Sequence, residues 1–242
     1  MAHISRHELK QDQLRTTFEE FEEFTKKRYK EILTVAGIVI LVAGLAGGLK
    51  VYQDRQEAEA NAQLGMALRT FRAYVGPTPP DNLLRGIERF PTSRDKYKKA
   101  LGEFQELIQR HARFPQPKAV AIARYHVGLC QAHLGDREAA IKTLQEASRN
   151  SDRNLAALAQ FALAGELLRA GKLEDATRLY GELAERPTST VPEVTARLAL
   201  ADAYRATQPA KARQIYAEIE KRFGADAVVA QVLKEQVASL PK

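Results

Sequence analysis

The chain has 242 residues and a formal net charge of +7, with 45% hydrophobic and 28% charged residues. This length suffices for one or two domains with a sizeable core, and the composition is that of a folded chain. No Lys/Arg-rich run carries interleaved aromatic residues, so the positive charge does not indicate a nucleic-acid partner. The single cysteine, Cys130, excludes a disulfide within the chain.

Residues 1–31 predict a cytoplasmic amphipathic segment. Ser5 and Glu8 have the spacing of a capping box that opens a helix. Leu14, Phe18 and Phe21 follow at helical spacing, with glutamates between and beside the phenylalanines. Such a helix suits either the inner membrane surface or a partner helix, and the sequence does not choose between them.

Residues 32–52 predict a single transmembrane anchor. No charged residue stands between Glu31 and Lys50, and this stretch spans roughly 27 Å as a helix, close to the hydrocarbon thickness of a bilayer. Tyr29 and Tyr52 flank it, as aromatic residues do at the headgroup layer. The alternatives are a buried core helix, which the polar flanks disfavour, and a cleaved signal, which the long acidic start disfavours.

The charges beside the apolar stretch predict its orientation. The cations at its N-terminal rim are Lys26, Lys27, Arg28 and Lys30. Only Lys50 and Arg55 lie close to the other rim. This bias favours a cytoplasmic N-terminus and an exported C-terminal domain, so we expect a bacterial inner-membrane protein whose C-terminal domain is periplasmic.

Three glycines of the apolar stretch predict a membrane helix-packing face. Gly37, Gly44 and Gly48 lie on one side of the helix. Gly44 and Gly48 have the G-x-x-x-G spacing, which lets two helices approach closely in lipid.

Residues 53–242 predict an all-α domain of repeated helical hairpins. The segments 125–147, 161–183 and 198–219 repeat with a period of 36 residues. The repeated positions are Ala140, Ala176 and Ala212; Leu144, Tyr180 and Tyr216; and Ala147, Leu183 and Ile219. Gly135 and Gly171 share the period, and each predicts a helix end before a tight turn. Small residues recur where the first helix must approach its partner, at Gly128, Ala164 and Ala201.

These hairpins resemble the tetratricopeptide repeat. Its L-G-x2-Y and A-x3-large patterns appear here as Leu200-Ala201-x2-Tyr204 and Ala176-x3-Tyr180. The family's tryptophan is missing, and the period of 36 residues is longer than the usual 34 or so. The resemblance implies a tetratricopeptide-like solenoid of helical hairpins after the membrane helix.

An earlier, stretched repeat precedes these hairpins. Its first helix is expected at 59–75, and its second contains Ala100, Phe104 and Leu107. Residues 76–95 between them are rich in Pro, Gly and Asp and predict an inserted loop. A final amphipathic helix at 226–240 is expected to cap the stack.

The sequence gives no sign of catalytic chemistry. It contains no G-x-S-x-G, H-E-x-x-H, P-loop or C-x-x-C motif. His111, His126 and His133 have no cysteine or paired carboxylates at ligand spacing, and Cys130 is expected to be a buried, inert thiol. We therefore predict no enzyme activity, no metal and no cofactor.

By analogy with the repeat family, the first helices line a concave surface that binds protein partners. The residues expected there are Tyr125, Leu129, His133, Phe161, Arg169, Leu198, Asp202 and Arg205. This mixture of apolar area and cations suits extended or unfolded peptide segments. The alternative is that several of these residues pack against neighbouring repeats.

The whole layout resembles the bacterial ancillary subunit of the SecYEG translocon. The shared features are a short polar N-terminus, one span and an exported tetratricopeptide-like domain. The resemblance implies a membrane-anchored protein-binding module that engages exported polypeptides or periplasmic chaperones near the translocon. The alternative function is a structural subunit or assembly factor of another bacterial inner-membrane or envelope complex.

Overall fold

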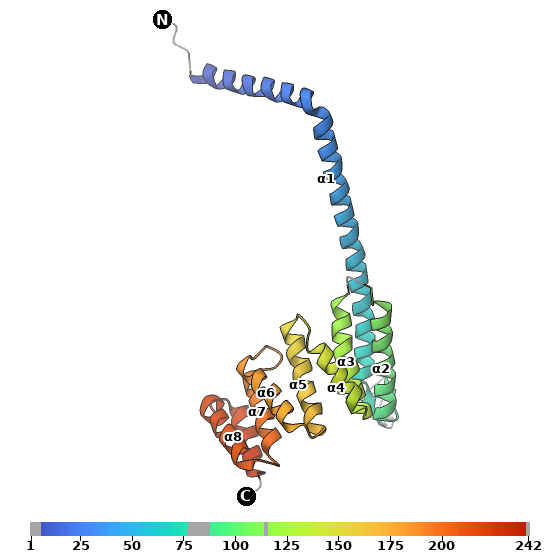
Figure 1. Ribbon diagram of the computed structural model, residues 1–242, viewed down its shortest axis with the longest axis vertical. Helices are drawn as coiled ribbons and strands as arrows, with labels where there is room; N and C mark the ends of the chain where they lie inside the picture. The colour runs from blue at the N-terminus through green and yellow to red at the C-terminus, as the bar shows by residue number, and fades with distance from the viewer. Residues whose placement is uncertain (1–5, 77–87, 114–115, 241–242) are drawn as a thin grey trace, which may run out of the picture. The chain divides into compact units, whose positions relative to one another are not determined.

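The computed structural model describes residues 6–76, 88–113 and 116–240, with the side chains from Arg28 onward except that of Ile32. Contacts along the chain divide it into two compact units, residues 1–55 and 56–242. The described residues are almost wholly helical, which confirms the all-α prediction (Figure 1).

Helix α1 runs from Arg6 to Arg72 and passes from the first unit into the second. Its backbone angles are non-helical at Arg28 (φ −119°, ψ 17°), where the sequence changes from charged to apolar. The expected capping box of Ser5 and Glu8, and the side chains of the amphipathic pattern before Arg28, lie outside the described residues.

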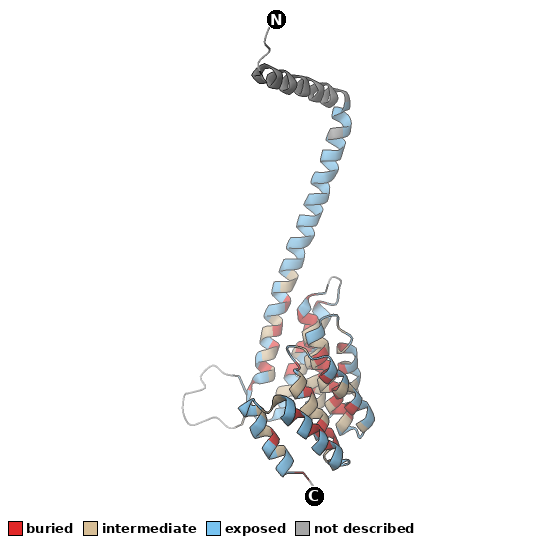
Figure 2. Ribbon diagram, turned by 90° about the vertical axis from the view of Figure 1, so that its left-hand side faces the viewer, coloured by how far each residue is buried: buried red, intermediate tan, exposed pale blue. Residues whose placement is uncertain are grey.

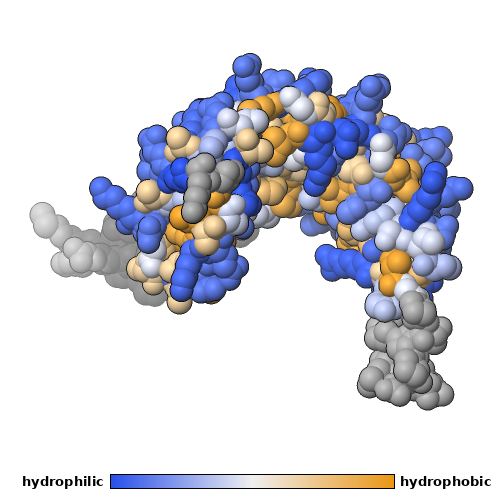
Figure 3. All heavy atoms as spheres, turned by 90° about the horizontal axis from the view of Figure 1, so that it is seen from below, coloured by the Kyte–Doolittle hydropathy of each residue, from blue (hydrophilic) through white to orange (hydrophobic). Residues whose placement is uncertain are grey.

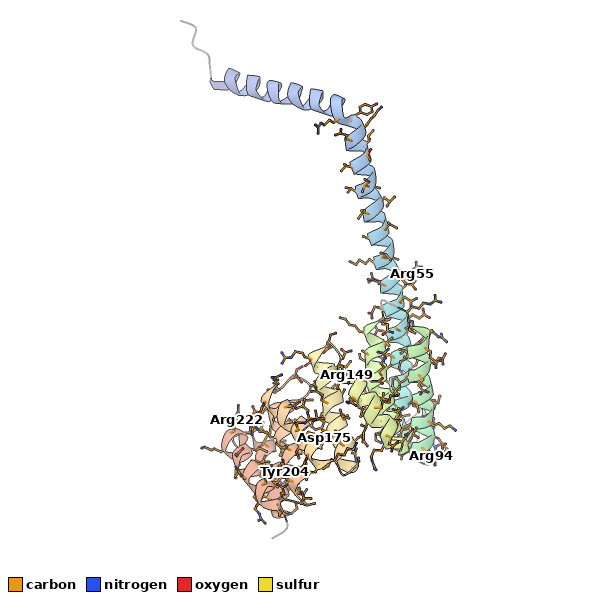
Figure 4. The ribbon with its side chains drawn as sticks, in the orientation of Figure 1. Arg55, Arg94, Arg149, Asp175, Tyr204 and Arg222 are labelled. Carbon is orange, nitrogen blue, oxygen red and sulfur yellow. The ribbon has the colours of Figure 1, made fainter. Side chains whose placement is uncertain are left out.

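The apolar stretch of α1 buries none of its faces. Every described side chain from Leu33 to Leu49 is exposed, as the pale blue helix in Figure 2 shows, and Leu33 and Leu41 are 66% and 62% exposed. In Figure 4 these side chains project on all sides of the helix. A core helix of a soluble fold buries its apolar side chains, so the buried-core alternative does not fit. The helix is long and apolar enough to cross a membrane.

Residues 56–242 form a row of helical hairpins. The helices after α1 are α2 (Ser93–Arg110), α3 (Lys118–Leu134), α4 (Arg137–Ala147), α5 (Arg153–Arg169), α6 (Leu173–Glu185), α7 (Glu193–Tyr204), α8 (Pro209–Phe223) and α9 (Ala227–Ala238). The end of α1 packs with α2 and α3, and the later hairpins are α3–α4, α5–α6 and α7–α8. Helix α9 packs on α8 through Leu233 and so caps the row. This arrangement confirms the tetratricopeptide-like solenoid.

The repeated positions of the second helices form the centre of each hairpin. The small residues Ala100, Ala140, Ala176 and Ala212 are all 0% exposed. Their large partners Phe104, Leu144, Tyr180 and Tyr216 are at most 5% exposed. The third members, Leu107, Ala147, Leu183 and Ile219, are at most 7% exposed. One buried pattern therefore recurs in every hairpin, because each second helix fills the same gap beside its first helix.

Glycines act at the turns and at one close contact. Gly135 and Gly171 follow α3 and α5 with φ of +87° and +76°, the left-handed conformation expected for these helix ends. Gly128 brings α3 against α4, since a Cβ added there would lie 2.7 Å from Cγ of Leu144. Asp136 then caps α4 by accepting a hydrogen bond from the amide of Ala139.

The first hairpin differs from the prediction in its details. Helix α1 ends at Arg72 rather than near 75, and Tyr74–Val75 (β1) pairs in parallel with Arg89–Phe90 (β2). Helix α2 begins at Ser93, because Oγ1 of Thr92 accepts a hydrogen bond from the amide of Asp95 (3.1 Å). Residues 93–95 are thus helical and not part of the expected loop, while residues 77–87 lie outside the described residues.

Candidate peptide-binding groove

Two first helices of neighbouring hairpins, α3 and α5, contact each other. Helix α3 packs on α5 as well as on its own partner, α4. Residues 56–242 curve into an arch, and Figure 3 shows apolar side chains gathered along its inner edge. This curvature gives the repeat domain a concave surface of the kind that helical-hairpin solenoids use for binding.

A pocket of about 460 Å³ lies between α3 and α5. Leu129 and His133 line it from α3, Phe161 and Arg169 from α5, and Tyr180 from α6. The structure thus brings together the members of the expected groove on α3 and α5 other than Tyr125. Tyr180 joins them with its ring against that of Phe161, at a centroid distance of 5.3 Å.

The pocket contains a buried acid that the sequence analysis did not single out. Glu166 of α5 is 5% exposed, and its carboxylate accepts a hydrogen bond from the guanidinium of Arg169. Nε of Arg137, in the first turn of α4, lies 3.9 Å from the other carboxylate oxygen. One buried carboxylate therefore pairs with two guanidinium groups that line the pocket. The sequence signal for this pair was available, because Glu166 stands within the apolar run of α5, three residues before Arg169.

Tyr125 and His133 of α3 contact different neighbours. Tyr125 is half-buried against the cluster that contains Leu144 and Leu163, and burial raises the pKa of its hydroxyl. The ring of His133 stacks on that of Tyr97 of α2 at a centroid distance of 4.0 Å. His133 therefore connects the first hairpin to the pocket wall.

The expected groove residues of α7 do not line this pocket, and they contact the last helices. Asp202 accepts a hydrogen bond from the hydroxyl of Tyr216 on α8 (2.5 Å). Arg205 donates to the side chains of Gln236 and Ser239 at the end of α9 (2.8 Å each). Leu198 is half-buried against the hydrophobic cluster that contains Tyr216 of α8 and Leu233 of α9. Tyr204, labelled in Figure 4, adds a further link within the hairpin, because its hydroxyl accepts a hydrogen bond from Lys211 (2.8 Å).

Gly37, Gly44 and Gly48 lie on the exposed stretch of α1. A Cβ added at any of them would meet nothing within 4 Å among the described residues. The helix therefore has room at these positions for a second helix.

Cys130 is completely buried on α3. Its exposure is 0%, and burial raises the pKa of its thiol to about 12. We expect a thiol reagent at about pH 8 to leave the native chain unmodified and to label it fully in denaturant, because only the thiolate reacts. Mass spectrometry of the intact protein measures both states, and rapid labelling of the native chain would contradict the expected burial.

His126 is half-buried among aromatic rings of the first hairpin. Its ring stacks on Phe104 with centroids 5.1 Å apart, and its Nδ1 lies 2.9 Å from the carbonyl oxygen of Ile122. Burial, reinforced by the charge of Arg72, lowers the pKa of His126 below its ordinary value of 6.5. The unfolded chain therefore binds more protons once the pH falls below about 6.5, so acid destabilises the folded state.

We expect the melting temperature to fall between about pH 7.5 and pH 5, and His126→Gln to reduce this fall. His133, whose pKa burial also lowers, titrates in the same window, so the pH dependence is reduced rather than abolished. Thermal unfolding followed by circular dichroism measures the effect. An identical pH dependence in the variant would show that His126 is not the group responsible.

The described residues contain no group of three or more His, Cys, Asp or Glu side chains that could hold a metal ion. The pocket lining combines apolar side chains with ionisable and hydroxyl-bearing ones.

Residues 123–151 match the model of the tetratricopeptide repeat family. They run from within α3 through α4 to the turn before α5, so the match covers the hairpin that forms one wall of the pocket. No curated protein sequence and no solved structure matches the chain. The chain thus carries a tetratricopeptide repeat, and proteins built from this repeat are generally protein–protein interaction modules and non-enzymatic scaffolds.

Proposed function

We propose that this chain is a single-pass membrane protein whose repeat domain binds segments of other polypeptides in the groove between α3 and α5. The observation that carries the proposal is the pocket of about 460 Å³ on this face of the tetratricopeptide-like solenoid. Apolar side chains such as Leu129 and Phe161 line it together with polar groups such as Arg137 and Arg169, and both kinds of group take part in the recognition of extended peptides.

The layout supports a place in the bacterial inner membrane with the repeat domain in the periplasm. The cations before the apolar stretch outnumber those after it, which favours a cytoplasmic N-terminus. A polar start, one span and a tetratricopeptide-like domain also suit a partner of the Sec translocon. In this role the groove receives exported polypeptides or periplasmic chaperones.

A second candidate is a structural subunit or assembly factor of another inner-membrane or envelope complex. The exposed face of Gly37, Gly44 and Gly48 favours it, because this face suits close packing against a helix of another membrane protein. In this role the span contributes to partner choice together with the repeat domain.

Site-specific photocrosslinking in native membranes tests the proposal. A photoreactive residue replaces Leu129 in the groove of the full-length chain, and a control replaces Lys142, which is exposed on α4. We expect position 129, and not position 142, to crosslink to exported polypeptides, periplasmic chaperones or translocon subunits. Crosslinks to the subunits of a different stable complex would support the second candidate. The absence of crosslinks from position 129 would overturn the groove as a binding site.

A further inference from the structure

We propose that the pocket between α3 and α5 selects segments in which an acidic side chain lies next to a large apolar one. This inference rests on the proposed function, because it specifies what the same groove binds. It follows from the two arginines and the large apolar side chains that line the same pocket.

The apolar part of the pocket is well placed for one large side chain. Leu129 from α3 and Phe161 from α5 are both half-buried and line the cavity. The ring of Phe161 is fixed by its edge contact with Tyr180. Filling this space with an aliphatic or aromatic side chain removes apolar surface of both partners from water.

The charged side chains that line the pocket have a net positive charge. Glu166 is the only acid among its lining residues, whereas Arg137 and Arg169 both line it. The two arginine side chains are 48% and 63% exposed, so each can reach a ligand while it stays beside Glu166. One carboxylate neutralises only one of two guanidinium groups, and an acidic ligand group balances the second.

Beyond the lining, one cation of α2 lies near the pocket, and one acid of α7, Asp202, lies near Tyr180. Lys96 of α2 lies 4.5 Å from the ring centre of Tyr97, the residue on which His133 of the pocket stacks. Gly165 also lines the pocket, beside the hydroxyl of Tyr180 and the Arg169 guanidinium. The arginines attract an acidic segment and repel a cationic one, so the pocket discriminates between the two.

Fluorescence anisotropy with the full-length chain in lipid nanodiscs tests the selectivity. The probes are fluorescein-labelled extended peptides that differ only in a central pair: Asp-Leu, Lys-Leu or Asp-Ser. We expect Asp-Leu to bind about tenfold more tightly than either of the others, with a preference over Lys-Leu that weakens as salt rises.

Matched arginine variants then locate the charge effect. We expect Arg169→Glu to remove the preference for Asp-Leu over Lys-Leu, and Arg153→Glu, at the exposed start of the same helix, to preserve it. Since Arg169→Glu also leaves Glu166 with a like charge, Arg169→Gln serves as a milder variant and is expected to reduce the preference.

The outcomes separate the inference from the proposed function. If Asp-Leu and Lys-Leu bind wild type equally, and Phe161→Ala weakens both, the groove binds peptides but the charge selectivity is wrong. If no peptide binds wild type, the proposed peptide-binding function fails as well. An unchanged preference in Arg169→Glu would also overturn the inference.

Discussion

Phe104→Ala is expected to destabilise the repeat domain by about 3–5 kcal/mol, the usual cost of removing a buried aromatic ring. Phe104 is 0% exposed and lies in the cluster that joins the end of α1 to α2 and α3. Leu64 of α1 and Val120 of α3 belong to that cluster. The ring also stacks on His126, so its loss leaves a cavity where three helices meet.

Urea unfolding of the full chain in detergent, followed by circular dichroism, measures this loss. Tyr74→Ala is the control, because Tyr74 is 43% exposed and its removal is expected to cost less than about 1 kcal/mol. The loss expected for Phe104→Ala is a large part of the roughly 5–15 kcal/mol that stabilises a typical domain. The first hairpin of this variant is therefore expected to unfold before the others. Equal losses in the two variants would contradict the packing of this hairpin.

Gly128→Ala is expected to destabilise the domain by about 1–3 kcal/mol, although alanine is the better helix former. A Cβ at position 128 would lie 2.7 Å from Cγ and 2.8 Å from Cδ2 of Leu144. Leu144 is 0% exposed, and buried side chains in protein cores are closely packed on all sides. Helices α3 and α4 must therefore separate or Leu144 must adopt a strained rotamer.

Gly102→Ala is the matched control and is expected to have the opposite sign. Gly102 lies within α2, is exposed, and a Cβ there would meet nothing within 4 Å. Alanine in an open helical position stabilises by about 0.5–1 kcal/mol. Urea midpoints of both variants decide the question, and a gain at position 128 similar to that at 102 would refute the close approach of α3 and α4.

The repeating core could be predicted because it depends on local spacing. Small residues recur every 36 positions at Ala140, Ala176 and Ala212, and a large residue follows each of them four positions later. This pattern can be read from the sequence because every second helix fills the same gap beside its first helix. Gly135 and Gly171 were predictable for a similar reason, since a left-handed helix end favours glycine wherever the chain turns sharply.

The groove was only partly predictable, because its geometry depends on contacts between hairpins. Analogy with the repeat family placed Leu129 and Phe161 on the inner face but gave no sign that Glu166 and Arg137 meet across α4 and α5. It also gave no sign that Arg205 contacts the end of α9. The short β1–β2 pair joins segments on either side of a loop, and two residues on each strand carry too weak a pattern to be recognised.

The central claim is that one membrane span anchors the repeat domain outside the cytoplasm. Cysteine labelling from one side of the membrane, in the full-length chain, tests this claim most directly. Cys130 stays in place because it is buried, and the reporters are Ser5→Cys at the N-terminus and Ser151→Cys in the exposed turn before α5. A membrane-impermeant maleimide is applied to spheroplasts of a Gram-negative host, and the membranes are then washed at alkaline pH.

The account predicts that both variants stay in the washed membrane, that position 151 is labelled in intact spheroplasts, and that position 5 is labelled only after lysis. A chain released into the soluble fraction, or one labelled at position 5 and not at 151 before lysis, would contradict it.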